Sequence, residues 1–125
     1  MSKKIAISGS RDIINEGLVR DLLKPHLTGD VVMLVGDCPR GVDRIATELA
    51  TELGIHCTVF EADWEAHGRA AGPLRNRKMV ADADQLVAIK RTGSANKGTS
   101  SAIAEAERAS VEVVTYEVAE KAKVF

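Results

Sequence analysis

Short apolar runs alternate along this chain with longer segments of helical period, and no other feature restricts its fold as much. The short runs are rich in Val and Ile and apolar on both faces, as the buried strands of a parallel sheet are. We predict five strands, at residues 4–8, 31–35, 55–60, 85–89 and 111–116. Between them we predict helices near residues 18–23, at 42–53 with Gly54 as the terminating residue, at 73–83 and at 100–109.

This strand and helix alternation predicts an α/β fold. Parallel strands need crossover connections of one hand, which place helices on both faces of the sheet. The chain has 125 residues, 45% of them apolar, enough to bury one core, and it shows no repeat or linker. We therefore expect residues 1–125 to form a single Rossmann-like, doubly wound domain with about five parallel strands. Ligands of such sheets bind at the carboxyl ends of the strands, so function is expected in the loops that leave those ends.

Composition and charge argue against several classes of partner. The 17 Lys and Arg nearly cancel the 18 Asp and Glu, and a formal charge of -1 disfavours binding to long nucleic acid or to an anionic membrane. Aromatic residues make up 3% of the chain, too few for base-stacking platforms. The amino-terminal segment fits neither a signal peptide nor a membrane span, so a cytoplasmic location is expected. Cys38 and Cys57 are expected to be free thiols, the three histidines lack a ligand spacing, and we expect no metal and no cofactor.

The loop after the first predicted strand carries residues that suit an anion. Gly9 allows close approach of the backbone, Ser10 supplies a donor, and Arg11 can bind a phosphate in a bidentate manner. A plain turn with a surface arginine fits this loop equally well. The loop does not read Gly-x-Gly-x-x-Gly, which disfavours a dinucleotide-dependent oxidoreductase.

The loop after the second predicted strand leads directly into a helix. Gly36 begins this turn, Arg40 lies within it, and Gly41 stands where the helix is expected to start. Free backbone amides and the helix dipole make that end an anion site. Asp43 has two interpretations, either a cap for its own helix amides or an acceptor for a ribose hydroxyl or a leaving base.

A basic segment precedes and enters the predicted helix at residues 73–83. Because Pro is favoured in a first helical turn, Arg75 and Asn76 are expected there, with side chains that reach the carboxyl edge of the sheet. Several cations around a positive helix end are unfavourable unless an anion or nearby acids neutralise them, and we favour a ligand. Trp64, just upstream, fits core or interface packing better than base stacking.

The loop after the fourth predicted strand is polar and contains glycine. Gly98 and Thr99 stand just before a predicted helix, where amides and hydroxyls can converge on a phosphate. The segment lacks the Gly-Lys-Ser/Thr of a P-loop, and a mobile connector remains the alternative interpretation. Four such loops on one edge indicate a site more strongly than any one of them does.

Taken in order, these motifs resemble the YspA-like branch of the SLOG superfamily, Rossmann-like nucleotide-ligand proteins that include the LOG phosphoribohydrolases and DprA. The resemblance spans nearly the whole chain, through residues 9–11, 36–43, 62–64, 71–76, 79, 83–84 and 98–99. It implies a site for a nucleotide or nucleotide-derived ligand, with phosphate held by glycine-rich loops and helix N-termini. It also implies a homo-oligomer, dimeric or larger.

One departure from the LOG pattern bears on activity. Those enzymes carry Pro-Gly-Gly-x-Gly-Thr-x-x-Glu at the fourth loop, and Ala102 stands here at the position of the glutamate. Our leading hypothesis is therefore a protein that senses or sequesters a small nucleotide-type ligand. One alternative is a phosphoribohydrolase-like enzyme that cleaves an N-glycosidic bond with Asp43 or Glu105 as acid and base. Further alternatives are a DprA-like accessory in single-stranded DNA processing and an assembly module that uses Trp64 and the helix faces.

Overall fold

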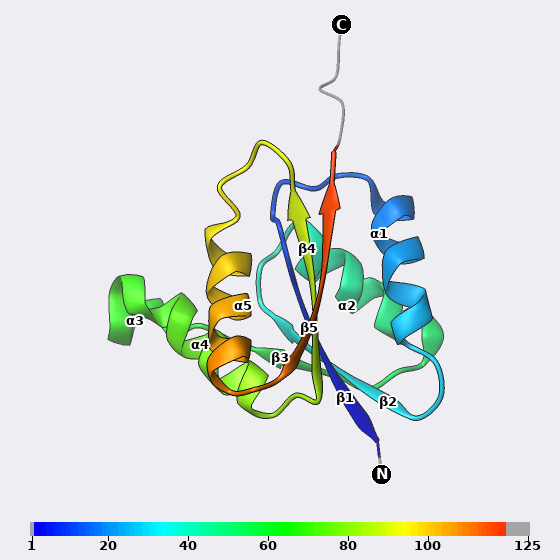
Figure 1. Cartoon of the computed structure of the whole chain (residues 1–125), viewed down its shortest axis with the longest axis horizontal. Coiled ribbons are helices and arrows are strands. Elements are labelled where there is room, and N and C mark those ends of the chain that lie inside the picture. The colour runs from blue at the N-terminus through cyan, green and yellow to red at the C-terminus, as the bar shows by residue number, and fades with distance from the viewer. Residues whose placement is uncertain (1, 120–125) are drawn as a thin grey trace, which may run out of the picture.

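A computed structural model describes residues 2–119 of the chain. Within that range, five strands form one sheet in the order β3-β2-β1-β4-β5, and each neighbouring pair is parallel. The strands are β1 (Lys3–Gly9), β2 (Val31–Gly36), β3 (Cys57–Phe60), β4 (Gln85–Arg91) and β5 (Glu112–Val118). The predicted Rossmann-like α/β fold is confirmed (Figure 1).

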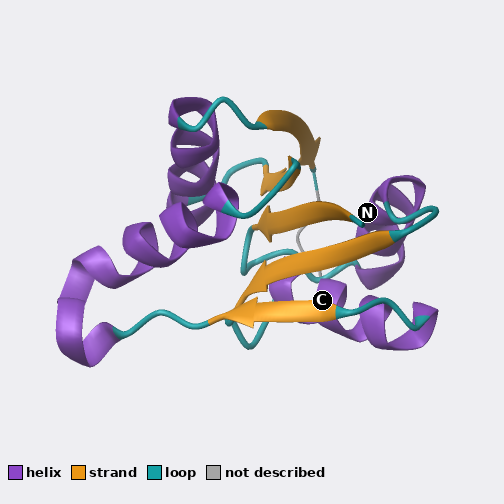
Figure 2. Ribbon diagram, turned by 90° about the horizontal axis from the view of Figure 1, so that it is seen from below, coloured by secondary structure: helices purple, strands orange, loops and turns teal. Residues whose placement is uncertain are grey.

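Helices cover both faces of the sheet (Figure 2). One face is covered by α1 (Glu16–Leu23) and α2 (Val42–Leu53), and the other by α4 (Ala71–Ala81) and α5 (Lys97–Arg108). The remaining helical segments of residues 2–119 are short: η1 (Lys24–His26), α3 (Trp64–His67) and η2 (Gly68–Ala70). The α3 segment projects away from the sheet ahead of α4 (Figure 1). None of the helices in the described range is long and apolar enough to cross a membrane.

The strands are apolar on both faces because each face has its own core. In β1, Ile5 and Ile7 pack against α1 and α2, whereas Ala6 between them packs against α4 and α5. All three are fully buried, and burial of one large aliphatic side chain contributes about 1.5–3 kcal/mol. Small residues at Ala102 and Ala106 let α5 lie close to β1 on the second face. This two-sided burial explains why the strand signal in the sequence is strong.

Several predicted boundaries differ from the observed ones by two or three residues, and three of these differences have a clear local cause. Residue 55 belongs to the capping turn that follows α2, because the Ile55 N–H donates to the carbonyl of Ala50 after Gly54 turns the chain at φ 67°. The strand therefore begins at Cys57. The fourth helix begins at residue 71 because η2 runs directly into it, and the last begins at residue 97, after a left-handed Asn96.

The strand order determines where a ligand can bind. From β1 the chain crosses through α1 to β2 on one side, whereas β4 pairs with the other side of β1. The loops after β1 and β4 therefore diverge, and a crevice opens between them at the carboxyl edge of the sheet. The loops after β1, β2, β3 and β4 all leave the sheet at this edge.

Candidate functional site

A cavity of about 260 Å³ lies at the point where the strand order reverses. Its walls come from the loop after β1, the end of β2, the first turn of α2, the inner face of α4 and the start of α5. We call this cavity the crevice; its lining is Ile7, Ser8, Gly9, Ser10, Arg11, Asp12, Gly36, Cys38, Asp43, Arg75, Asn76, Met79, Ala95, Asn96, Lys97, Gly98 and Thr99. Of the predicted ligand-binding residues, it collects all but Arg40 and Gly41.

The glycines beside the crevice are needed for packing within the protein. A Cβ on Gly9 would lie 2.4 Å from the side chain of Val42, so glycine lets α2 start directly against the end of β1. A Cβ on Gly36 would lie 2.6 Å from Nη1 of Arg75. Gly41 has φ 71°, and its Cβ would lie 2.4 Å from the carbonyl oxygen of Ser10. The sequence pattern identified these positions, and at Gly9 and Gly41 a side chain in place of the hydrogen would meet other protein atoms.

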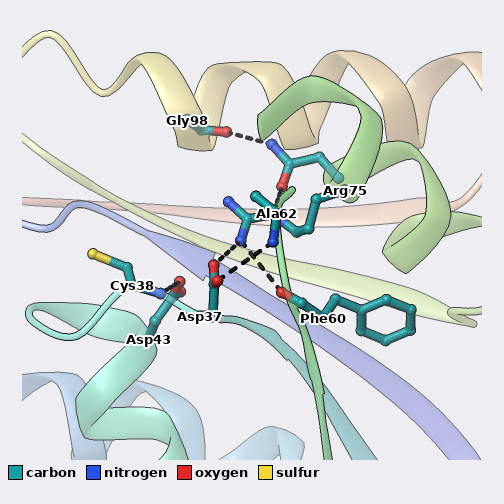
Figure 3. A network of polar contacts seen from close by, with 8 residues as sticks. Asp37, Cys38, Asp43, Phe60, Ala62, Arg75 and Gly98 are labelled. Carbon is teal, nitrogen blue, oxygen red and sulfur yellow. Dashed lines mark hydrogen bonds and ion pairs between the residues drawn. The ribbon is translucent and has the colours of Figure 1, made fainter. Parts of the chain in front are cut away.

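Arg75 is the centre of a polar network on one wall of the crevice (Figure 3). Its Nη1 donates to Asp37 at 2.8 Å and to the carbonyl of Phe60 at 3.4 Å, and its Nε donates to Oδ1 of Asn76 at 2.8 Å. The amide nitrogen of Asn76 in turn donates to the Gly98 carbonyl at 3.2 Å. The network therefore joins the ends of β2 and β3 to α4 and α5.

Two details of this network differ from the sequence prediction. Arg75 and Asn76 stand in the second turn of α4, because the helix begins at Ala71. Asp37 balances the charge of Arg75 within the protein, so Arg75 does not require a bound anion to neutralise it, as the sequence prediction had assumed. Nη2 of Arg75, however, donates to no group within residues 2–119 and remains a donor at the crevice.

Asp43 lies at the floor of the crevice and is 8% exposed. Its Oδ2 accepts from the backbone N–H of Cys38 at 3.3 Å, so it ties the loop to α2 and does not cap its own helix. Burial raises the pKa of Asp43 to about 6, against the lowering effects of the Cys38 amide and the Arg75 charge. A carboxyl group that titrates near neutrality inside a cavity can give or take a proton.

The start of α5 presents free donors to the crevice. Asn96 precedes the helix at φ 53°, and its side chain bonds to the carbonyls of Arg91 and Ser94, leaving the first helical amides without a side-chain cap. The amides of Lys97, Gly98 and Thr99 therefore lack an intrahelical partner, as the first turn of a helix always does. The helix dipole makes this end attractive to an anion.

Two exposed cations stand at the same rim. The side chains of Arg11 and Lys97 form no hydrogen bond or ion pair within the described part of the chain, and both line the crevice. The sequence predicts Lys97 as a cation beside these loops, although not as a ligand-binding residue. Asp37 was missed as the partner of Arg75, because nothing in the sequence links residues that lie 38 positions apart.

Three predicted residues lie outside the crevice. Arg40 and Gly41 line a neighbouring depression that also contains Arg11. Glu105, one of the two acid candidates, pairs with Arg77 and Arg108 in a hollow between α4 and α5. We call it the outer hollow; its lining is Arg77, Val80, Ala81, Glu105, Arg108 and Ala109. The structure therefore does not bring Glu105 together with Asp43, because its helical position faces α4 and not the end of the sheet.

Two further features of the sequence have a place in the structure. Trp64 is 57% exposed, so it does not pack in the core, and the tip of its ring lies 3.3 Å from the position of a Cβ on Gly72. Cys38 and Cys57 are free thiols. Among residues 2–119, no three His, Cys, Asp or Glu side chains gather closely enough to hold a metal ion.

The strand order defines a Rossmann-like α/β protein, and the crevice lies where that order reverses. A family model described as "YspA, cpYpsA-related SLOG family" matches residues 3–67. The chain belongs to this family, and the resemblance noted in the sequence is confirmed.

Two known proteins show how far the similarity extends. Gene 61 protein of Mycobacterium phage D29 is 34% identical over 122 residues, which cover 91% of this chain and 96% of that protein. The crystal structure of DNA processing protein A (DprA) from Streptococcus pneumoniae superposes with a TM-score of 0.52 and 13% identity over 90% of this chain. This chain spans 58% of the DprA chain, and at this identity the likeness shows the fold alone.

Proposed function

We propose that the chain binds a nucleotide, or a phosphorylated molecule derived from one, in the crevice. The observation that carries this proposal is the convergence of unpaired donors on one cavity. These donors are Nη2 of Arg75, the side chains of Arg11 and Lys97, and the first amides of α5. Charge-assisted hydrogen bonds of this kind hold phosphate oxygens, and a helix N-terminus adds a favourable dipole. Membership of a SLOG family supports a nucleotide-related function.

The remaining walls of the crevice suit more than a bare phosphate. Ile7 and Met79 supply apolar surface, and the carboxyl of Asp43 supplies an acceptor on the floor. A cavity of about 260 Å³ is far larger than a phosphate ion and lies near the lower end of ligand pockets, roughly 300–1,000 Å³. A nucleotide can bind where apolar surface meets its base or sugar, an acceptor meets a hydroxyl, and donors meet its phosphate. The crevice offers all three.

A thermal-shift screen tests this proposal. The full chain is mixed with the nucleoside monophosphates, with cyclic nucleotides, with ADP-ribose and with inorganic phosphate alone. A ligand at a hundred times its dissociation constant stabilises the fold by about 2.7 kcal/mol, a rise of several degrees in Tm. Lys97→Ala should remove most of the shift, whereas Lys78→Ala, another exposed lysine on a helix, should leave it unchanged. If no nucleotide raises the Tm of the wild-type chain, the proposal fails.

A second candidate function is hydrolysis of an N-glycosidic bond, and the pKa of Asp43 is the observation that favours it. A buried acid with a pKa of about 6 can protonate a leaving base while water adds to the sugar. Chromatography of a nucleoside monophosphate incubated with the chain would detect the free base. Under this alternative, Asp43→Asn binds nucleotide but releases no base. If neither the wild type nor the variant releases base, binding alone is the function.

A further inference from the structure

A second depression adjoins the crevice. It is lined by Arg11, Asp12, Ile13, Ile14, Arg40, Gly41 and Arg44. Arg11 and Asp12 line both hollows, so the two meet at these residues. We call this second hollow the Arg11–Arg40 depression. A ligand that fills the crevice therefore has a direct continuation beyond Arg11.

The two loops that form this depression are fixed against each other. The Val42 N–H donates to the carbonyl of Ser10 at 3.2 Å. A Cβ on Gly41 would lie 2.4 Å from that same carbonyl and 2.5 Å from Cα of Arg11. The backbone that carries Arg40 thus rests directly on the backbone that carries Arg11, and the stems of both side chains start from neighbouring points.

The charges along the depression define a short positive track. The side chain of Arg11 has no partner within residues 2–119, whereas Arg40, 65% exposed, forms a long ion pair with Asp12 at 3.8 Å, beyond hydrogen-bond distance. Arg44, at the far side, is neutralised by Glu16 at 2.5 Å and Glu48 at 2.9 Å. Arg11 and Arg40 therefore keep guanidinium donors that form no hydrogen bond within the described residues, and these donors can bind one anionic group beyond the crevice.

We propose, resting on the function proposed above, that the ligand carries a second phosphate and that Arg11 and Arg40 bind it. The ligand class is then a nucleoside diphosphate or a nucleotide linked through a diphosphate, with the first phosphate at the start of α5. A polynucleotide would need a longer track, and here the track is closed by the paired Arg44. The formal charge of -1 points the same way.

Calorimetric titration of the full chain with AMP, GMP, CMP and UMP, and with the four corresponding diphosphates, tests this inference. We expect the diphosphate of the preferred base to bind about tenfold tighter than its monophosphate, as one charge-assisted contact implies. Arg40→Ala should remove this difference and leave the monophosphate affinity within about twofold of the wild type. Arg108→Ala is the matched control, since Arg108 is similarly exposed, at 69%, and lies in the outer hollow.

The outcomes separate this inference from the function on which it rests. If monophosphates and diphosphates bind equally, or if Arg40→Ala weakens both alike, the second-phosphate site is wrong while nucleotide binding stands. If no nucleotide binds, both proposals fail. A single-stranded oligonucleotide that binds tighter than every mononucleotide, and loses affinity in Arg40→Ala, would assign the depression to a polynucleotide and overturn the inference.

Discussion

Asp43 and Glu105 are the two buried acids that the sequence offered as proton donors, and the structure places them in different regions. Asp43 is 8% exposed and lies in the crevice, where one backbone amide and the nearby charge of Arg75 are its main favourable contacts. Glu105 is 7% exposed and lies in the outer hollow. There two arginines bond directly to its carboxylate.

The difference shows that partners, and not burial, decide what an acid can do. The Glu105 carboxylate accepts hydrogen bonds from two guanidinium groups, one on α4 and one on α5, and so links the two helices. A carboxylate that burial has left with few partners has a raised pKa and resists the charged state. In the crevice, polar groups such as the Asp43 carboxyl have few hydrogen-bond partners. In the outer hollow, the Glu105 carboxylate is bonded to two arginines.

The largest expected effect concerns the two acids themselves. The folded pKa of Asp43, about 6, lies above its ordinary value of 3.8, so the folded chain binds this proton more tightly than the unfolded chain does. Asp43 therefore lowers the free energy of unfolding as the pH rises from about 4 to about 6. Asp43→Asn should stabilise the chain at pH 7 by up to about 3 kcal/mol and lose this advantage below about pH 4.

Urea unfolding at several pH values measures this effect, with Glu105→Gln as the counterpart. Loss of the Glu105 charge leaves Arg77 and Arg108 without their partner and should destabilise the chain by about 1 kcal/mol at pH 7. The comparison breaks if Asp43→Asn is less stable than the wild type at neutral pH, because Asp43 would then be stabilised as a charge.

The second effect compares two arginines on the same helix. Arg75 is paired with Asp37 at 14% side-chain exposure, whereas Arg77 is 61% exposed and contacts Glu105 at 3.3 Å. Arg75→Ala should lower the free energy of unfolding by about 2 kcal/mol, since it also leaves Asp37 unpaired. Arg77→Ala should lower it by about 0.5 kcal/mol or less. Equal losses in denaturant melts would show that the crevice network adds nothing beyond a surface pair.

The third effect concerns space. A Cβ on Gly36 would lie 2.6 Å from Nη1 of Arg75 and 2.9 Å from Oδ2 of Asp43. Gly36→Ala should therefore displace Arg75 and cost about 1 kcal/mol, with weaker nucleotide binding. Gly98→Ala, with nothing within 4 Å of the new Cβ, should fold as the wild type does. Thermal melts and nucleotide titrations of both variants decide whether the network tolerates an added methyl group.

The smallest effect compares the two ends of α5. Lys97 stands at the start of the helix and faces the crevice, whereas Arg108 stands in its last turn and faces the outer hollow. A cation opposes the helix dipole at the start and complements it at the end. Lys97→Ala should raise the free energy of unfolding by about 0.5 kcal/mol without ligand, and Arg108→Ala should lower it by a similar amount. A loss in Lys97→Ala would contradict the view that Lys97 is kept for a ligand.

The sequence predicted the sheet well because its strands are buried on both faces, as at Ile5, Ala6 and Ile7. It also predicted the loops of the crevice, since parallel strands end at one edge. The strand start was predicted too early, at Ile55, because an apolar residue in the capping turn of a helix has the same sequence pattern as the first residue of an apolar strand.

Pairings between distant residues could not be predicted. Asp37 and Arg75 meet only because β2 and α4 are neighbours in the fold. The direction in which Glu105 faces depends on where α5 begins, and the helix begins at Lys97, three residues earlier than predicted. Arg108, three residues after Glu105, is the sequence feature that could have indicated an ion pair there.

The most direct test of the central claim is a titration of the isotope-labelled full chain with the tightest-binding nucleotide of the panel, followed by amide NMR shifts. We predict that the largest changes occur at the amides of Ser10, Gly98 and Thr99, which border the crevice. The amides of Val80 and Ala109, in the outer hollow, should stay in place. Changes concentrated in the outer hollow, or no changes at millimolar nucleotide, would contradict the assignment of the crevice as the nucleotide site.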